Sequence, residues 1–216
     1  MSHQDDALEN LRVIRSLMER AHVYRAISAP AAMAGGLLAV ALSTLQLREG
    51  MALVDASRPE GFVLPWLGLL ILVSALNTAL LRREALRHGR PFVSPGMRAA
   101  LRALCPPLGV GGVLGLGLML GLHNLTLGAL IWALCHGLGL LATASFSPRS
   151  LTRLGWAFVV TGLVLFLAWV ADDRVRQLPS DEAPAAVVMG LTFGLLHVAY
   201  AVAVFLRRPT APASDD

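Results

Sequence analysis

The stretch APAAVVMGLTFGLLHVAYAVAVFL, residues 183–206, decides the fold class of this chain. It carries no Asp, Glu, Lys or Arg and is long enough to cross the roughly 30 Å hydrocarbon core of a bilayer as an α-helix. Its one ionisable side chain is the imidazole of His197, close to the middle. The stretch predicts a membrane-spanning helix. An ionisable side chain in the middle of such a helix is energetically costly, so the presence of His197 there has to be explained.

Five other apolar runs have spanning length, and none of the six contains Asp, Glu or Arg in its interior. The whole chain is 56% hydrophobic and only 15% charged, against roughly 25% charged residues in soluble domains. We therefore expect an all-α, polytopic membrane helix bundle with six transmembrane helices in residues 28–206. The predicted spans are 28–47, 62–81, 104–122, 125–145, 153–171 and 183–206.

The arginines predict how the bundle is oriented. Of the 18 basic residues, all arginine, only Arg48, Arg58, Arg174 and Arg176 lie on the predicted outer side. The other fourteen lie on the side that holds both termini, and short loops rich in arginine stay cytoplasmic. Because these arginines flank apolar runs, the net charge of +4 indicates contact with anionic lipid headgroups, and we predict no nucleic-acid partner.

The chain before the first span has the periodicity of an amphipathic helix. Leu11, Ile14, Leu17 and Met18 fall on one face at 100° per residue, while charged residues fall on the other. We predict a cytoplasmic amphipathic helix within residues 1–27. It could lie on the lipid surface, pack beneath the bundle, or bind a cytoplasmic protein through residues 5–27. The Pro-, Ala- and Asp-rich tail, residues 207–216, is predicted to be disordered.

The third span has an unusual composition. Pro106 and Pro107 remove two backbone donors, and six glycines follow before His123. A kinked or partly broken helix is expected there.

Two histidines could meet inside the bundle. His136 and His197 lie in spans of the same predicted direction, at depths that differ by roughly 4 to 5 Å at 1.5 Å per residue. Such a pair could ligate a haem iron, bind a metal or relay protons. The alternative is structural: a membrane histidine also hydrogen-bonds a carbonyl or hydroxyl of a neighbouring helix. The lack of any Asp or Glu within the spans weakens the proton relay.

Small residues accompany His197 in the last span. Gly190, Gly194, His197 and Ala201 recur every three or four positions and predict one narrow stripe for close packing against another helix. Tyr200 lies beside the stripe and offers a second hydrogen-bonding group. Asn77 in the second span needs polar partners in hydrocarbon, although it lies near Arg82 and the interface.

Motifs of known chemistry are absent from the sequence. Cys105 and Cys135 stand alone in apolar surroundings, without metal-type spacing. No phosphate-binding loop, zinc-protease or serine-hydrolase signature occurs. We expect no catalytic residues, no metal site and no cofactor, with His136 and His197 as the only weak cofactor candidates.

Two segments carry a resemblance. LRVIRSLMERAHVYRAISAPAAMAGGLLAV near the start and AAVVMGLTFGLLHVAYAVAVFLRR near the end resemble the ends of a family of small, uncharacterised bacterial six-span integral membrane proteins. The resemblance implies a bacterial inner membrane location and a signalling or stress context, and it brings no reaction or substrate.

The leading expectation is a non-enzymatic structural or regulatory membrane module. The first alternative is a small-molecule transporter or channel, in which Asn77, His136 and His197 would line a cavity. The second is a redox membrane protein with haem between His136 and His197. The oligomeric state is left open.

Overall fold

The computed structural model describes residues 27–49, 58–87, 89, 93, 95–145, 147–173 and 181–207, and every regular element within them is a helix. The first five spans are α2 (Ala29–Glu49), α3 (Glu60–Arg87), α4 (Pro95–Leu116), α5 (Leu125–Ala142) and α6 (Arg149–Ala171). The last helix is composite: α8 (Glu182–Met189), the π-helical segment η2 (Gly190–Leu196) and α9 (His197–Leu206). The predicted amphipathic helix before Ile27 and the tail after Arg207 lie outside the described residues.

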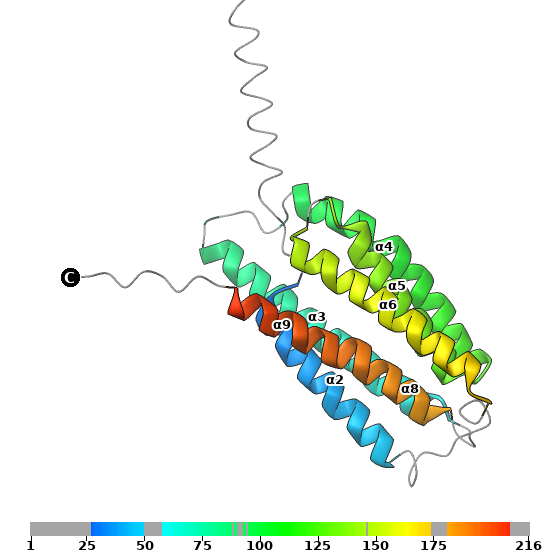
Figure 1. Cartoon of the computed structure of the whole chain (residues 1–216). Helices are drawn as coiled ribbons and strands as arrows, with labels where there is room; N and C mark the ends of the chain where they lie inside the picture. Colours follow the sequence, from blue (N-terminus) through cyan, green and yellow to red (C-terminus); the bar gives the residue numbers. More distant parts are fainter. Residues whose placement is uncertain are drawn as a thin grey trace, which may run out of the picture.

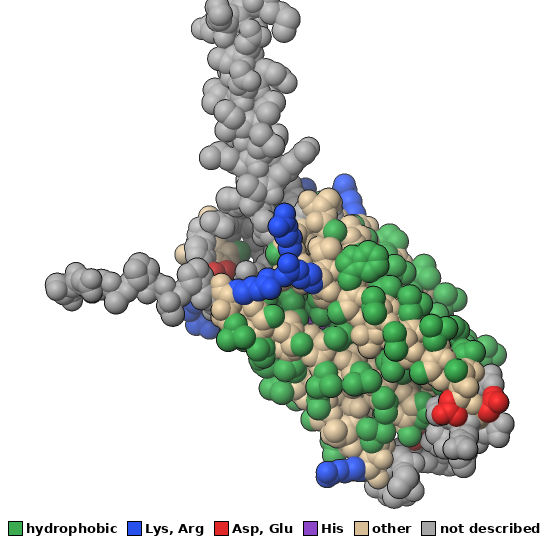
Figure 2. All heavy atoms as spheres, viewed as in Figure 1, with side chains coloured by type: hydrophobic (Ala, Val, Ile, Leu, Met, Phe, Trp, Pro, Cys, Tyr) green, Lys and Arg blue, Asp and Glu red, His purple; other side chains and the backbone are tan. Residues whose placement is uncertain are grey.

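Within the described residues, six helices are long and apolar enough to cross a bilayer, which indicates a multi-pass membrane protein. Hydrophobic side chains cover much of the visible side of the bundle, and arginines gather near one end of it (Figure 2). Several helices extend beyond the predicted apolar runs; α3, for example, continues through the charged stretch from Arg82 to Arg87. Hydropathy locates the hydrocarbon-facing part of a helix, whereas polar turns at the interface add to its length.

The third span differs from the expectation in where it is irregular. The α4 helix continues through Pro106 and Pro107 without a break, and the irregular part is the π-helical segment η1 (Gly117–Gly121) at its other end. Proline is tolerated in membrane helices because neighbouring groups satisfy the backbone that it frees. The η1 segment closes into the short connection to α5, where His123 has a positive φ of 53°.

The helices form two groups that meet at the last helix. In Figure 1, α2 and α3 lie with the last helix on one side, and α4, α5 and α6 lie on the other. Residues of α5 contact α8, and residues of α6 contact η2 and α9. Two apolar cores result, one that includes Phe62, Met119 and Met189, and one that includes Phe158 and Ala201.

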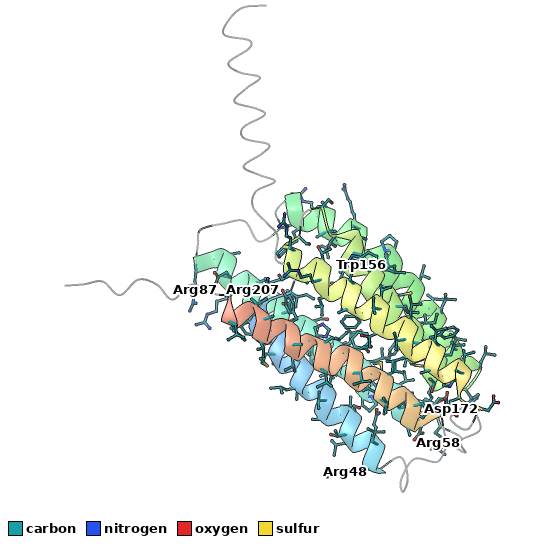
Figure 3. The ribbon with its side chains drawn as sticks, viewed as in Figure 1. Arg48, Arg58, Arg87, Trp156, Asp172 and Arg207 are labelled. Atoms are coloured by element: carbon teal, nitrogen blue, oxygen red, sulfur yellow. The ribbon has the colours of Figure 1, made fainter. Side chains whose placement is uncertain are left out.

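Charged side chains mark the two ends of the bundle. Arg87 and Arg207 lie at one end, while Arg48, Arg58 and Asp172 lie at the opposite end (Figure 3). Each of these residues lies within two residues of a helix terminus. The apolar middle is thus bounded by charge at both ends, as expected for a bundle in a bilayer.

Candidate functional site

The structure brings the two predicted histidines together. His136 lies in the second half of α5, and His197 is the first residue of α9. Their ring centroids are 5.6 Å apart, with an angle of 56° between the rings. The predicted depths of the two histidines in their spans thus indicated a pair of side chains, from α5 and α9, that contact each other in the structure.

Two phenylalanines complete what we call the aromatic cluster: His136, Phe158, Phe193 and His197. The Phe158 ring, on α6, lies 4.8 Å from the His136 ring and 5.4 Å from the His197 ring, between centroids. Phe193, on η2, lies 5.2 Å from His136 and 5.3 Å from Phe158. Phe158 is fully buried, so phenyl rings enclose the imidazoles.

The hydrogen bonds of the histidines differ from the expectation. His197 Nδ1 lies 3.0 Å from the carbonyl oxygen of Phe193, four residues earlier in the same helix and not on a neighbouring one. Because a carbonyl only accepts, the Nδ1 atom carries the hydrogen. His136 Nε2 is buried and has no hydrogen-bond partner among the described residues. Such a buried, unpaired group costs about 1 to 3 kcal/mol.

The aromatic cluster suits packing better than ligation. A haem between His136 and His197 needs a wide flat space around both imidazoles, but Phe158 contacts each of these rings. Cys135, the neighbour of His136, is a free thiol. In the described part of the chain, no three His, Cys, Asp or Glu side chains come close enough to hold a metal ion.

The residues of the predicted glycine stripe do not all contact the same helix: Gly190 and Gly194 contact α2, whereas His197 contacts α5 and α6. A Cβ atom added to Gly190 would lie 2.8 Å from Ser43 Cβ, and one added to Gly194 would lie 3.2 Å from the backbone nitrogen of Val40, both on α2. Gly36 of α2 faces Gly194 in the same way, 2.9 Å from its carbonyl oxygen. We call Gly36, Gly190 and Gly194 the glycine contact.

His197 does not share the glycine contact and instead faces α5 and α6. The reason is η2: the wider turn of a π-helix rotates the residues that follow it relative to those that precede it. The stripe was predicted with regular α-helical geometry, whereas Gly190 and Gly194 lie within η2 and His197 directly follows it. Ala201 is fully buried in the apolar core that contains Ala29 and Ala32.

Asn77 and Tyr200 stabilise the start of α2 and do not line a cavity with the histidines. The backbone N–H of Ser28 donates to Asn77 Oδ1 at 2.9 Å. The hydroxyl of Tyr200 donates to the carbonyl oxygen of Ile27 at 3.3 Å. Both side chains thus satisfy backbone groups just before α2, where Ser28 Oγ caps the helix by accepting from Ala31 N–H.

Two polar contacts were not anticipated from the sequence. Ser43 Oγ donates to the carbonyl oxygen of Ala186 at 2.7 Å, a buried bond between α2 and α8. The carboxylate of Asp181 accepts from the backbone N–H of Thr126 at 2.8 Å and also binds the Thr126 hydroxyl. Asp181 thereby caps the start of α5 from the start of α8. Neither pairing has a local sequence signal, because the partners are 143 and 55 residues apart.

The sequence analysis did not identify Phe158 and Phe193 as neighbours of the histidines, although the position of Phe193 in the sequence could have indicated it. It lies four residues before His197, the spacing at which side chains meet on one helix face.

Comparisons of the chain with known protein families, with curated proteins and with solved structures gave no match. The conclusions below therefore depend on the geometry of this chain.

Proposed function

We propose that the chain is a non-enzymatic membrane module with a structural or regulatory role. Its bundle would hold the segment 5–27 at the membrane surface, where that segment binds a cytoplasmic protein. One observation carries the proposal: the two imidazoles that meet within the bundle, His136 and His197, are packed against Phe158 and Phe193. Reaction or transport sites need access for a substrate, and these rings occupy the space around both imidazoles.

The orientation belongs to the same proposal. Arg87 and Arg207 would lie at the cytoplasmic face of a bacterial inner membrane, and Arg48 and Arg58 at the outer face. The arginine bias of the sequence supports this assignment, because positively charged short loops remain inside. The bacterial inner membrane location is the prediction that the resemblance to small bacterial six-span proteins implies, and it agrees with this orientation.

Deletion of residues 1–24 tests the proposed role. We expect the truncated protein to insert into membranes normally, because the six spans are unchanged. Cytoplasmic proteins that co-purify with the full chain after crosslinking should be lost from the deletion variant, as quantified by mass spectrometry. A full chain in which Leu11 and Ile14 are both replaced by Ala should lose the same partners if the apolar face of the helix binds them.

Unchanged recovery of partners from the deletion variant would contradict the proposal. A flux assay in proteoliposomes examines the transporter alternative independently. Uptake that is specific for one solute and is lost in His136→Ala would favour transport over a regulatory module.

A further inference from the structure

A pocket of about 180 Å³ lies between the first turns of α6 and the last turns of α9. Its lining residues recur every three or four positions on each helix, so one face of each helix forms a wall. The lining comprises Ser150, Arg153, Leu154, Ala157, Leu196, Ala199, Tyr200, Ala203 and Arg207. The pocket is adjacent in sequence to the aromatic cluster, since Ala157 precedes Phe158 and Leu196 precedes His197.

The neighbouring rings explain why the pocket exists. Phe158 and His197 place bulky rings between α6 and the last helix, at 5.4 Å between centroids. Beside these rings and toward the arginine end, the facing side chains include Ala157, Ala199 and Ala203. Methyl groups cannot fill a gap whose width is set by aromatic rings, so space remains between the helices.

The pocket has a charged end and an apolar end. Arg153 and Arg207 are exposed lining residues, and neither guanidinium has an ion pair or hydrogen bond within the described ranges. Leu154, Leu196 and the three alanines line most of the remainder, together with Ser150 and Tyr200. The α6 helix also begins here after Pro148, which makes no side-chain cap, so the positive end of its dipole adds to the two arginines.

We propose that this pocket binds one anionic phospholipid, with its phosphate between Arg153 and Arg207 and an acyl chain against the apolar wall. The proposal requires the membrane location that the six helices indicate, and it is independent of the cytoplasmic partner proposed above. Basic pockets between membrane helices are suited to acidic headgroups. A cavity of about 150 Å³ accommodates a benzene-sized group, so this pocket admits a phosphate and the first carbons of one chain while the rest of the lipid stays in the bilayer.

A soluble phosphorylated compound shares the phosphate chemistry but gains nothing from the apolar wall. Two features thus favour a lipid: Arg207 lies at the end of the bundle that also holds Arg87, and the same pocket is lined by both arginine and apolar side chains. The lipid chosen as probe is phosphatidylglycerol, which carries a single negative charge, and the neutral reference is phosphatidylcholine.

Retention of phosphatidylglycerol by the full chain, measured by native mass spectrometry after release from mixed-lipid nanodiscs, tests the proposal. The variant is R153Q/R207Q. The matched control is R87Q/R149Q, which removes the same charge from exposed arginines that do not line the pocket. We expect the control to retain the lipid as the wild type does. Retention by R153Q/R207Q should fall about twenty-five-fold, because each arginine near an anionic headgroup contributes about fivefold in affinity.

A second variant keeps both charges. In Ala203→Leu, the larger side chain takes up space in the pocket one turn from Arg207, so retention should also fall. This variant tests the proposal whether or not R153Q/R207Q folds. Equal retention by either folded pocket variant and the wild type overturns the proposal. Thermal stabilisation in phosphatidylcholine nanodiscs by glycerol 3-phosphate, equal to that given by phosphatidylglycerol, would assign the site to a soluble phosphate and overturn the lipid. Partner recovery plays no part in these measurements, so the two proposals can fail separately.

Discussion

The two sides of the last helix are packed in opposite ways. Toward α2, glycines let the backbones approach so closely that a Cβ atom on Gly194 would lie within 3.2 Å of Val40 N. Toward α5 and α6, four aromatic and imidazole rings hold the helices apart, and a pocket follows where alanines replace the rings. The last helix is thus held by close backbone contact with α2 on one side, and it leaves a pocket beside α6 on the other.

The physical basis is the difference between small and large side chains in hydrocarbon. Without a hydrophobic driving force between helices, close van der Waals packing and a few hydrogen bonds hold them together. The glycine contact supplies the first, and the buried bond from Ser43 to Ala186 supplies the second. The aromatic cluster instead fills volume, and its cost is the unpaired His136 Nε2 atom.

The largest expected effect is on the ring side. Phe158→Ala removes a fully buried ring that contacts His136, Phe193 and His197. We expect the free energy of unfolding to fall by about 3 to 5 kcal/mol, because the surrounding rings cannot close the cavity completely. Reversible unfolding in mixed micelles measures this. Leu163→Ala, on an exposed face of the same helix, is the control, and an equal loss there would argue against the aromatic cluster as a core.

The next largest effect is expected on the glycine side. Gly194→Leu should separate α2 from the last helix and cost about 1 to 3 kcal/mol or more through overpacking, since both the side chain and the backbone nitrogen of Val40 lie in the way. The melting temperature in detergent reports the effect. Gly109→Leu is the matched control, because a Cβ atom there would meet nothing within 4 Å. Similar melting temperatures for the two variants would refute the close approach.

The smallest effect is expected for His136→Phe. A phenyl ring keeps most of the volume of the imidazole and removes the buried Nε2 atom that lacks a partner. Stability should change by less than about 1 kcal/mol or rise, because an unsatisfied buried polar group is lost. His136→Ala, which opens a cavity, should be clearly less stable. If both variants lose the same stability, the imidazole has a role beyond packing.

Much of the fold could be predicted from the sequence because membrane insertion depends on local properties. The length of each apolar run, the absence of charge within it and the arginines beside it are all readable in the chain. Residues 183–206, for example, match the last helix to within one residue at its start. The sequence did not show where the third span would be irregular: α4 continues through Pro106 and Pro107, because neighbouring groups can satisfy the backbone that proline frees, and the π-helical segment η1 follows among the glycines.

The site could be predicted only in part. Similar predicted depths, about 4 to 5 Å apart, indicated that His136 and His197 could meet, and small residues at positions 190 and 194 indicated a close helix contact. The π-helical segment η2 could not be foreseen, and it turns His197 away from the glycine contact. Asn77 has the polarity of a cavity residue, but its partner is the backbone N–H of Ser28, which lies 49 residues earlier.

The sequence by itself thus determined the class of protein, the number of helices and the ends at which arginines gather, because hydropathy and charge act on each segment separately. Tertiary structure alone decided which neighbour each side chain meets. The glycine contact, the enclosure of the histidines by Phe158 and the pocket beside Arg153 and Arg207 all arise between helices far apart in the chain. Their spacing depends on the side chains of two helices at once, so neither helix encodes it alone.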